Sequence, residues 1–272
     1  MVEIPYSIIE PKRERVPMLL SLPHCGTDFP DELVEEFVPL MIEAPDDTDW
    51  NLDILYDFAT SLGVTIICPK YSRWVIDLNR EPENRPLYDD GRIITALCPV
   101  TDFQGNSIYK DNRPSVPDPE IKRRTKRYFA PYHDRIDEEL ESLRSEFGFA
   151  VFWDGHSIRR HVPTIQPDPF PDFILGSNDR QSADNWVIES ALRALGTGNY
   201  DISHNNPFKG GYLTRSKGDP ANNIHALQLE MSKDLYMRAH ETVYSKSKAS
   251  PVKMHLENVF AALIRSMEEY EV

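Results

Sequence analysis

Cysteine is scarce in this chain, with three residues among 272. Cys25, Cys68 and Cys98 form no CxxC pair, so a disulfide framework is excluded and the count fits a reducing compartment. No stretch approaches the roughly 18 consecutive apolar residues of a membrane-spanning helix. The first residues, MVEIP, carry neither the basic nor the apolar region of a signal peptide. We therefore expect a cytoplasmic protein with no membrane partner.

Positive charge is also in short supply, since 30 Lys and Arg residues stand against 44 Asp and Glu, a net charge of −14. A chain of this charge repels nucleic acid and anionic membranes at long range. The basic run at 122–127 is short, and an acidic run at 134–141 follows it. With 40% hydrophobic residues, the composition is that of a globular protein. It argues against a nucleic-acid partner and leaves the oligomeric state open.

Hydrophobic periodicity predicts alternating strands and helices. Short apolar runs typical of strands lie at Met18–Leu22, Val64–Cys68, Arg73–Leu78, Phe149–Trp153 and His225–Met231. Helical stripes that end at a glycine lie at 52–62, 125–147 and 186–195. Ser250 and Pro251 are expected to open a last helix. The alternation predicts an α/β fold with helices on both faces of a central sheet, in one domain over residues 1–272.

A long segment at residues 81–119 is rich in Pro, Asn, Asp and Gly and shows no periodicity. Connections between elements of a compact domain are usually much shorter than this. We therefore expect a functional excursion or a lid in this part of the chain.

Polar side chains directly follow several of the strand-like runs. His24, His156 and Glu230 each stand at the end of one, while Asp47 and Asp49 stand at the start of a helix. In sheets of this class, functional groups gather beyond the carboxyl ends of the strands. Two histidines and one carboxylate are the ligands of a catalytic zinc, and a separate glutamate can act as base toward water. The pattern indicates a metal-dependent hydrolase.

Each of these side chains also has a structural interpretation. His24 can be a hydrogen-bonded structural histidine and His156 a buried one at a strand end, although Asp154, two residues before His156, could hold that imidazole as a partner behind a metal. Asp47 and Asp49 can cap a helix N-terminus. Glu230 can form a salt bridge, because an unpaired charge at the end of a core strand is costly. The residues alone leave these alternatives open.

Three arginines, Arg73, Arg80 and Arg215, lie beside strand-like runs. Guanidinium groups bind carboxylates through two parallel hydrogen bonds. Several of them in one cleft predict a small anionic substrate despite the acidic surface. The structural alternative is that each arginine pairs with an acidic side chain such as Asp77.

Cys25 offers a competing chemistry, that of a cysteine hydrolase. Its neighbour His24 points the opposite way on an extended segment and is poorly placed as the base. His156 is then left for that role, and we expect metal chemistry instead.

Six segments carry a resemblance: PHCGTDFP at 23–30, DDTDWNLDILYDFA at 46–59, YSRWVIDLNR at 71–80, FWDGHSI at 152–158, NNPFKGGYLTR at 205–215 and HALQLEMS at 225–232. In this order they resemble the N-formylglutamate amidohydrolase family, also called N-formylglutamate deformylase. The resemblance implies a mixed central sheet with helices on both faces, similar to the core of zinc carboxypeptidases. The implied reaction is hydrolysis of N-formyl-L-glutamate to formate and L-glutamate, the closing step of one histidine-degradation route.

The resemblance also implies a metal centre with one zinc ion or another divalent metal. Its ligands would be His24, His156 and one aspartate, and we prefer Asp49 to Asp47. Glu230 matches the position of the catalytic base.

Asn79, Arg80 and Arg215 match positions that are expected to grip a small anionic N-acyl amino acid, and Arg73 joins them as a candidate. One departure is the stretch 176–180, GSNDR, where we expect Gly-Thr-x-x-Gly. That loop is expected to shape a substrate pocket, so a related N-acyl amino acid amidohydrolase of other specificity is an alternative. A non-catalytic protein that binds anionic amino acids is a second alternative, and it could dispense with the metal.

Overall fold

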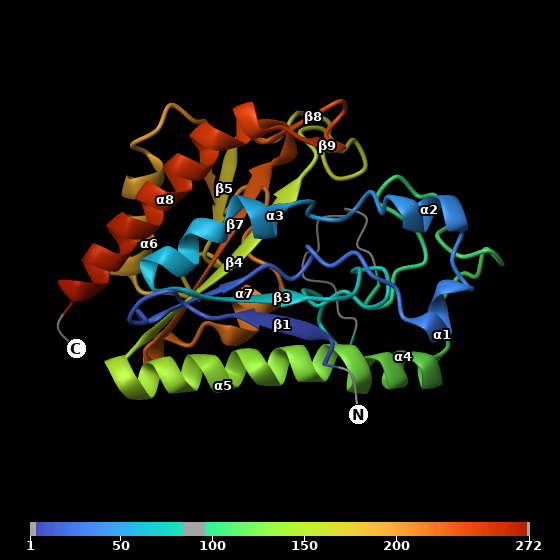
Figure 1. Ribbon diagram of the computed structural model, residues 1–272, viewed down its shortest axis with the longest axis horizontal. Helices are drawn as coiled ribbons and strands as arrows, with labels where there is room; N and C mark the ends of the chain where they lie inside the picture. Colours follow the sequence, from blue (N-terminus) through green and yellow to red (C-terminus); the bar gives the residue numbers. More distant parts are fainter. Residues whose placement is uncertain (1–3, 84–95, 271–272) are drawn as a thin grey trace.

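A seven-stranded sheet forms the centre of the computed structural model, which describes residues 4–83 and 96–270 (Figure 1). Across the sheet the strands are β1 (Tyr6–Ile9), β3 (Thr65–Pro69), β2 (Met18–Ser21), β4 (Ala150–Ile158), β7 (Ile224–Ser232), β5 (Phe173–Gly176) and β6 (Ile202–His204). The four strands β3, β2, β4 and β7 run parallel, β1 pairs antiparallel with β3, and β5 pairs antiparallel with β7 but parallel with β6. The expected mixed sheet is therefore confirmed.

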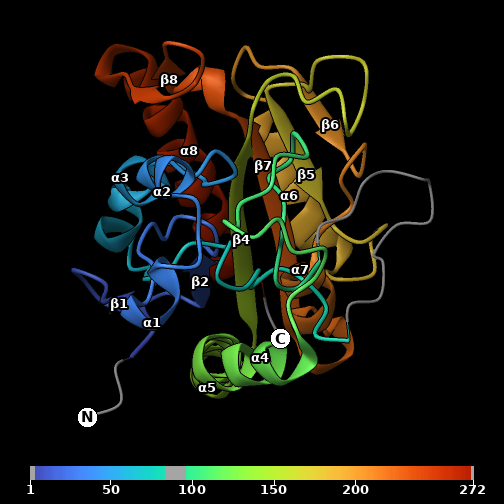
Figure 2. The same ribbon diagram turned by 90° about the vertical axis from the view of Figure 1, so that its right-hand side faces the viewer.

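Helices cover both faces of this sheet, as expected. On one face lie α8 (Lys246–Glu268), α6 (Asn185–Leu195) and the 3-10 helix η1 (Asp57–Leu62), and on the other lies α5 (Ala130–Phe147). Side-chain alternation along β4 serves both layers, because Val151 and Trp153 enter the first core while Ala150 and Phe152 enter the second. Figure 2 shows β4, β7 and β5 side by side between these layers.

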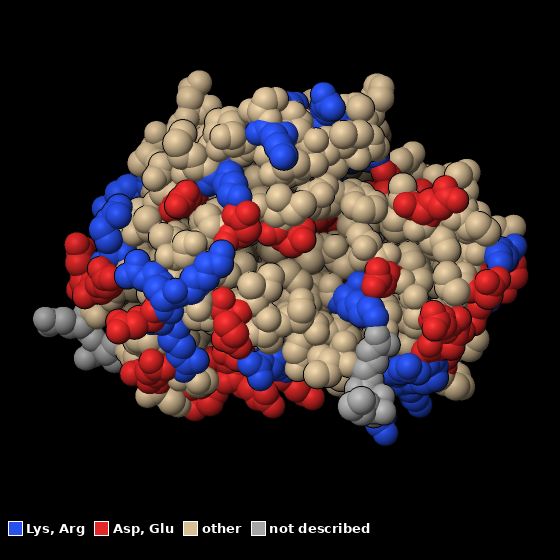
Figure 3. All heavy atoms as spheres, in the orientation of Figure 1, with Lys and Arg blue, Asp and Glu red and all other residues tan. Residues whose placement is uncertain are grey.

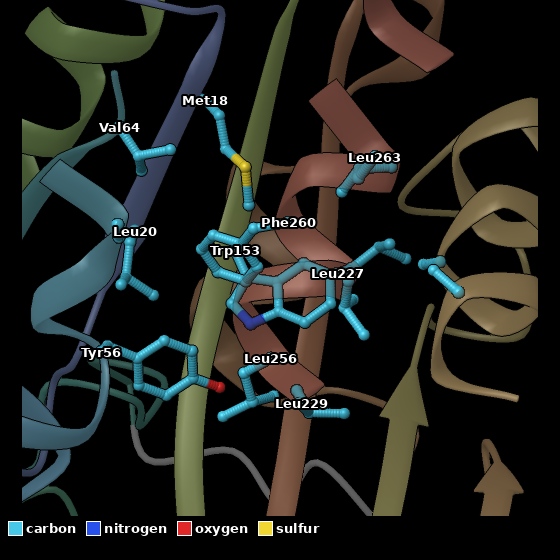
Figure 4. Close-up of a cluster of buried hydrophobic side chains, with 14 of the residues drawn as sticks. Met18, Leu20, Tyr56, Val64, Trp153, Leu227, Leu229, Leu256, Phe260 and Leu263 are labelled. Carbon is cyan, nitrogen blue, oxygen red and sulfur yellow. The ribbon is translucent and has the colours of Figure 1, made fainter. Parts of the chain in front are cut away.

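The core between the sheet and α8 is built largely from aromatic and branched side chains (Figure 4). Phe260 is fully buried, and its ring centroid lies 5.2 Å from that of Trp153 and 5.7 Å from that of Tyr56. Leu227 and Leu229 of β7 reach the same cluster. Burying one such side chain contributes about 1.5–3 kcal/mol, so this layer is a main source of stability.

The remaining elements are short. They are α1 (Asp31–Val34), α2 (Pro39–Glu43), α3 (Leu52–Leu55), α4 (Asp118–Arg124), the π-helical turn η2 (Thr125–Phe129), α7 (Tyr212–Lys217), η3 (Pro220–Asn222), η4 (Lys233–Leu235), β8 (Met237–Arg238) and β9 (Val243–Tyr244). The helix expected over 125–147 is present as η2 and α5, and it ends at Gly148 with φ at 86°. Gly63, with φ at 91°, ends η1 in the same way.

Two expectations about local structure are wrong. The run Arg73–Leu78 forms turns and no strand, because its polar members bend the chain: Asn79 N donates to Asp77 Oδ1 at 2.9 Å. The last helix begins at Lys246, so Pro251 lies inside it. Pro251 removes one helical hydrogen bond, but the helix continues because its apolar stripe is buried on the sheet.

Part of the segment expected as a lid, residues 84–95, lies outside the described residues. Its described remainder packs in the second core, where Leu97, Cys98 and Tyr109 are buried. Among the described helices, none has both the length and the apolar composition that a membrane crossing requires. On the face in Figure 3, basic and acidic side chains are interspersed, so the charge there is not of a single sign.

Candidate active site and metal centre

The polar residues singled out in the sequence meet at the carboxyl ends of β2, β4 and β7. His24 follows β2, His156 lies in β4, and Glu230 is the register partner of His156 in β7. The backbone N–H of Asp49 donates to the carbonyl of His24 at 2.9 Å, which joins the two loops. Gly26 permits this turn, because a Cβ there would lie 2.4 Å from the carbonyl oxygen of Tyr71.

His24, Asp49 and His156 form a group whose nitrogen and oxygen ligand atoms all lie within 4.8 Å of one another. Asp49 Oδ2 lies 3.1 Å from His156 Nδ1 and 3.7 Å from His24 Nδ1. All three side chains are buried. Two imidazole nitrogens and a carboxylate oxygen facing one point are the ligand set of a catalytic zinc, so the residues fit such an ion.

Each histidine also contacts a second carboxylate through its other ring nitrogen, Nε2. His24 Nε2 lies 2.7 Å from Asp77 Oδ1, and His156 Nε2 lies 3.1 Å from Asp154 Oδ1. Such a contact fixes the ring orientation and directs the other nitrogen, Nδ1, toward Asp49. Asp77 therefore serves the site, although the sequence suggested only that it could pair with an arginine.

The two histidines differ in their electrostatics. Burial and the neighbouring Arg73 lower the pKa of His24 to about 4, so this imidazole is neutral and keeps a lone pair for a metal. Burial also opposes protonation of His156, but Asp154 and Asp49 outweigh it and raise the pKa of His156 well above its ordinary value. Asp49 is buried too, yet His156 lowers its pKa. A bound cation would take the place of the proton between His156 and Asp49.

Of the two candidate aspartates, only Asp49 lies with the histidines. Asp47 accepts hydrogen bonds from Trp74 Nε1 at 2.9 Å and from the backbone N–H of Phe103 at 3.1 Å. Neither aspartate caps α3, whose N-cap is Asn51 and which has no side-chain cap. The geometry therefore favours the metal interpretation of Asp49 over helix capping.

Glu230 is half-buried beside His156. Among the described residues, no hydrogen bond or ion pair engages its carboxylate, so the salt-bridge alternative finds no partner there. Burial raises the pKa of Glu230 to about 8, and Asp49 adds to this while His156 opposes it. A carboxyl group of this kind can accept and return a proton near neutral pH.

Arg73 is buried next to the metal-ligand group. Its Nη2 donates to Asp77 Oδ2 at 2.6 Å, and its Nη1 lies 3.2 Å from His24 Nδ1. Arg80 is less buried and approaches the same Asp77 oxygen at 3.5 Å. Both arginines thus pair with Asp77, which is the structural alternative considered from the sequence. Arg73 also reaches Nδ1 of His24, the nitrogen that would bind a metal.

Asn79 connects the site to the segment that carries Arg215. Asn79 Nδ2 lies 2.8 Å from His156 Nε2, and Asn79 Oδ1 accepts the backbone N–H of Leu213 at 2.7 Å. Gly211 packs so tightly on this amide that a Cβ would lie 2.4 Å from Asn79 Nδ2. Arg215, in α7, is half-buried and donates from Nε to the carbonyl of Gly210 at 2.9 Å.

The loop at 176–180 supports the same segment. Asn178, Asp179 and Arg180 all have positive φ, at 47°, 54° and 68°. The backbone N–H of Asn178 donates to the carbonyl of Lys209 at 2.6 Å, close to Gly210. The loop therefore contacts the segment that leads to α7.

Cys25 does not have the environment of a nucleophilic thiolate. A hydrogen bond with Cys68, together with burial and the charges of Asp53 and Asp49, raises its pKa well above the ordinary value. A catalytic cysteine needs the opposite shift. The cysteine-hydrolase alternative therefore lacks support.

Sequence reasoning missed Lys233, which is 3% exposed and lies three residues beyond Glu230. Burial lowers its pKa, while Asp49, Asp46 and Asp47 partly restore the charged form. Its position directly after β7, a strand that ends at the site, is the signal that could have identified it.

Comparison with known proteins gives a consistent family. The sequence model of the N-formylglutamate amidohydrolase family matches residues 16–237. The chain is 39% identical over 253 residues to an N-formylglutamate deformylase of Pseudomonas putida, covering 92% of this chain and 93% of that one. It is 42% identical over 233 residues to an N-formylglutamate deformylase of Pseudomonas aeruginosa, covering 83% and 84%.

A solved structure is similar over almost its whole length. The crystal structure of N-formylglutamate amidohydrolase from Ralstonia eutropha JMP134 superposes with a TM-score of 0.78 at 25% identity, covering 96% of this chain and 98% of that one. The sequence match and the shared fold agree with each other. The chain therefore belongs to the N-formylglutamate amidohydrolase family.

Proposed function

We propose that this protein is a metal-dependent amide hydrolase that cleaves N-formyl-L-glutamate to formate and L-glutamate. The observation that carries the proposal is the convergence of His24, Asp49 and His156 next to Glu230 in a member of this family. The proposal treats residues 1–272 as one catalytic domain, since β1 and α8, from opposite ends of the chain, pack against the same sheet.

The metal in this proposal is zinc, and His24, Asp49 and His156 would hold it. When bound, the ion supplies Lewis acidity that polarises a carbonyl group and eases deprotonation of water. Asp77 and Asp154 keep the two imidazoles turned toward it.

Glu230 acts as the base in this reaction. Its carboxylate accepts a proton from the water that adds to the formyl carbon, and it returns that proton to the amide nitrogen as the C–N bond breaks. Formate and the free amine of glutamate are then the products. The half-buried position beside His156 suits this role, because removal from water raises the carboxyl pKa to about 8, near the range where both steps are easy.

The arginines and Asn79 position the substrate and its developing charge. Arg73, held by Asp77, presents Nη1 at the metal-ligand group, where it can donate to the carbonyl oxygen as negative charge builds up. Arg80 and Arg215 bind carboxylate of the N-acyl amino acid. Asn79 keeps His156 and the segment of Arg215 in register with each other.

The test is an assay of formate and glutamate release by the purified protein, before and after treatment with a chelator. We expect one metal ion per chain, loss of activity on chelation and recovery with zinc. His156→Ala should lose both metal and activity, because a three-ligand site seldom survives on two. Full activity in a metal-free sample would contradict the proposal, and so would an absence of hydrolysis in a zinc-loaded one.

A further inference from the structure

A cavity of about 460 Å³ lies beside the metal-ligand group and is not explained by the roles assigned so far. Phe103, Ile158 and Val162 form apolar parts of its wall, and Ser157 and Lys233 are among the polar ones. It adjoins the site through Phe103, whose ring centroid lies 4.9 Å from the guanidinium carbon of Arg73.

Lys233 lines this cavity with a buried side chain whose ammonium group makes fewer hydrogen bonds than it has donors. An ammonium group has three N–H donors. Among residues 4–83 and 96–270, Lys233 Nζ makes one hydrogen bond, a long one of 3.4 Å to the carbonyl oxygen of Asp46, and no ion pair. A buried charge without such partners is costly, so its placement calls for a ligand.

Three acidic groups that act on Lys233, Asp46, Asp47 and Asp49, are engaged elsewhere, and among the described residues Glu230 forms no ion pair with it. Arg159 donates from Nε to both carboxylate oxygens of Asp46, each at 3.1 Å. Asp47 accepts its two hydrogen bonds from Trp74 and Phe103, and burial raises its pKa. The positive charge of Lys233 is therefore left to face the cavity. Arg159 also lines this space but is paired with Asp46, and neither Arg80 nor Arg215 lines it.

We propose that Lys233 binds the side-chain carboxylate of the substrate and that this cavity is the side-chain subsite. This inference rests on the proposed function. A formyl group has no atoms beyond its carbonyl to fill such a space, whereas a glutamate side chain offers two methylenes for the apolar wall and a carboxylate for the ammonium. Lys233 would then select acidic N-acyl amino acids, and Arg80 and Arg215 would hold the α-carboxylate.

The experiment compares kcat/KM for N-formyl-L-glutamate and N-formyl-L-glutamine, which have nearly the same shape but differ in side-chain charge. We expect the wild-type protein to prefer the glutamate substrate by about 10²-fold or more. Lys233→Met should remove most of this preference by slowing the glutamate substrate, and it should leave the glutamine substrate within about threefold of wild type. Metal content should be unchanged.

Lys253→Met is the matched control, because Lys253 lies on α8 and pairs with Asp57 outside the cavity. It should keep the full preference. Lys233→Arg retains the positive charge and should keep part of the preference for the glutamate substrate. If Lys233→Met does not fold, inhibition of the wild-type protein decides, since L-glutamate should then inhibit at least about tenfold more strongly than L-glutamine.

The outcomes separate this inference from the proposed function. A wild-type protein that cleaves N-formyl-L-glutamate without preferring it over the glutamine analogue would overturn the role of Lys233 alone. Equal losses on both substrates in Lys233→Met would do the same and assign the residue a positioning role. A metal-loaded wild-type protein that cleaves neither substrate would instead overturn the proposed function.

Discussion

Strand β4 takes part in two regions that are built on opposite physical principles. Trp153 points into the apolar core under α8 (Figure 4), whereas Asp154 and His156 point into the polar site at the end of the strand. The core packs many apolar side chains at similar distances, so no single contact is essential to its geometry. The site depends on a few hydrogen bonds of 2.7–3.1 Å, which join His24 to Asp77 and His156 to Asp49 and Asn79.

This difference predicts how substitutions in each region should change the free energy of unfolding and the reaction rate. Removing a core side chain leaves a cavity and lowers the free energy of unfolding, while the site keeps its geometry as long as the protein is folded. Removing a charged group from the site lowers the reaction rate. It also removes the free-energy cost of burying that charge, so the stability of the fold need not decrease. Three variants and conditions test this separation, from the largest expected effect to the smallest.

Glu230→Gln should have the largest effect, and it should be on rate alone. The amide keeps the shape of the side chain but cannot accept the proton from water, so we expect kcat to fall by about 10²–10⁴-fold. Metal content should stay at the wild-type level, and the free energy of unfolding should not decrease. Steady-state kinetics, elemental analysis and urea denaturation measure the three quantities.

Glu257→Gln, at an exposed position on α8, is the control and should behave like the wild-type protein. Near-wild-type activity in Glu230→Gln would rule out the base. Loss of the metal in that variant would make Glu230 a metal ligand and return Asp47 and Asp49 to a structural role.

Phe260→Ala should destabilise the apolar core and leave the activity of the folded protein unchanged. Phe260 is fully buried between Tyr56, Phe58 and Trp153, so its truncation should cost about 3–5 kcal/mol of unfolding free energy. Activity per folded molecule should remain close to wild type. Met254→Ala on the same helix, at a side chain that is 62% exposed, should change stability by at most about 0.5 kcal/mol. A large fall in kcat for folded Phe260→Ala would show that the two regions are coupled.

His133 is a polar group in apolar surroundings away from the metal ligands, and it should give the smallest effect. It stacks on Phe129 and contacts the carbonyl oxygen of Leu78 at 2.8 Å, while burial and Lys217 lower its pKa from 6.5 to about 3. His133 is therefore protonated below about pH 6.5 in the unfolded chain, whereas in the folded protein it stays neutral down to about pH 3. Between pH 7 and pH 5 this histidine should cost about 2 kcal/mol of stability.

His133→Gln removes that proton uptake, so its unfolding free energy should fall about 2 kcal/mol less than that of the wild-type protein between pH 7 and pH 5. The other histidines contribute equally to both proteins and cancel in the difference. His240→Gln, at an exposed position, should follow the wild-type curve. Identical pH dependence for His133→Gln and wild type would show that His133 is protonated in the folded state at pH 5.

Much of the fold can be predicted because its signals are local. The buried strands β2, β3, β4 and β7 appear as short apolar runs, and the glycines at 63 and 148 end helices through a backbone conformation that glycine adopts freely. β1 and β6 lie at the edges of the sheet and are only partly buried, so no apolar run marks them, and β5 is as short and as buried as β2 but was not predicted. The run Arg73–Leu78 misleads because its apolar side chains are buried by the segment after residue 96, which no local pattern reveals.

For this protein, the sequence by itself determined the layered α/β architecture, the acidic net charge and, through its resemblance to a family, His24, Asp49, His156 and Glu230 as candidates. These follow from periodicity and from motifs within single segments. Only the tertiary structure separated Asp49 from Asp47, brought Asp77 to His24 and placed Lys233 against a cavity. Such facts depend on which loops meet across 50 or more residues, and packing of the whole chain decides that.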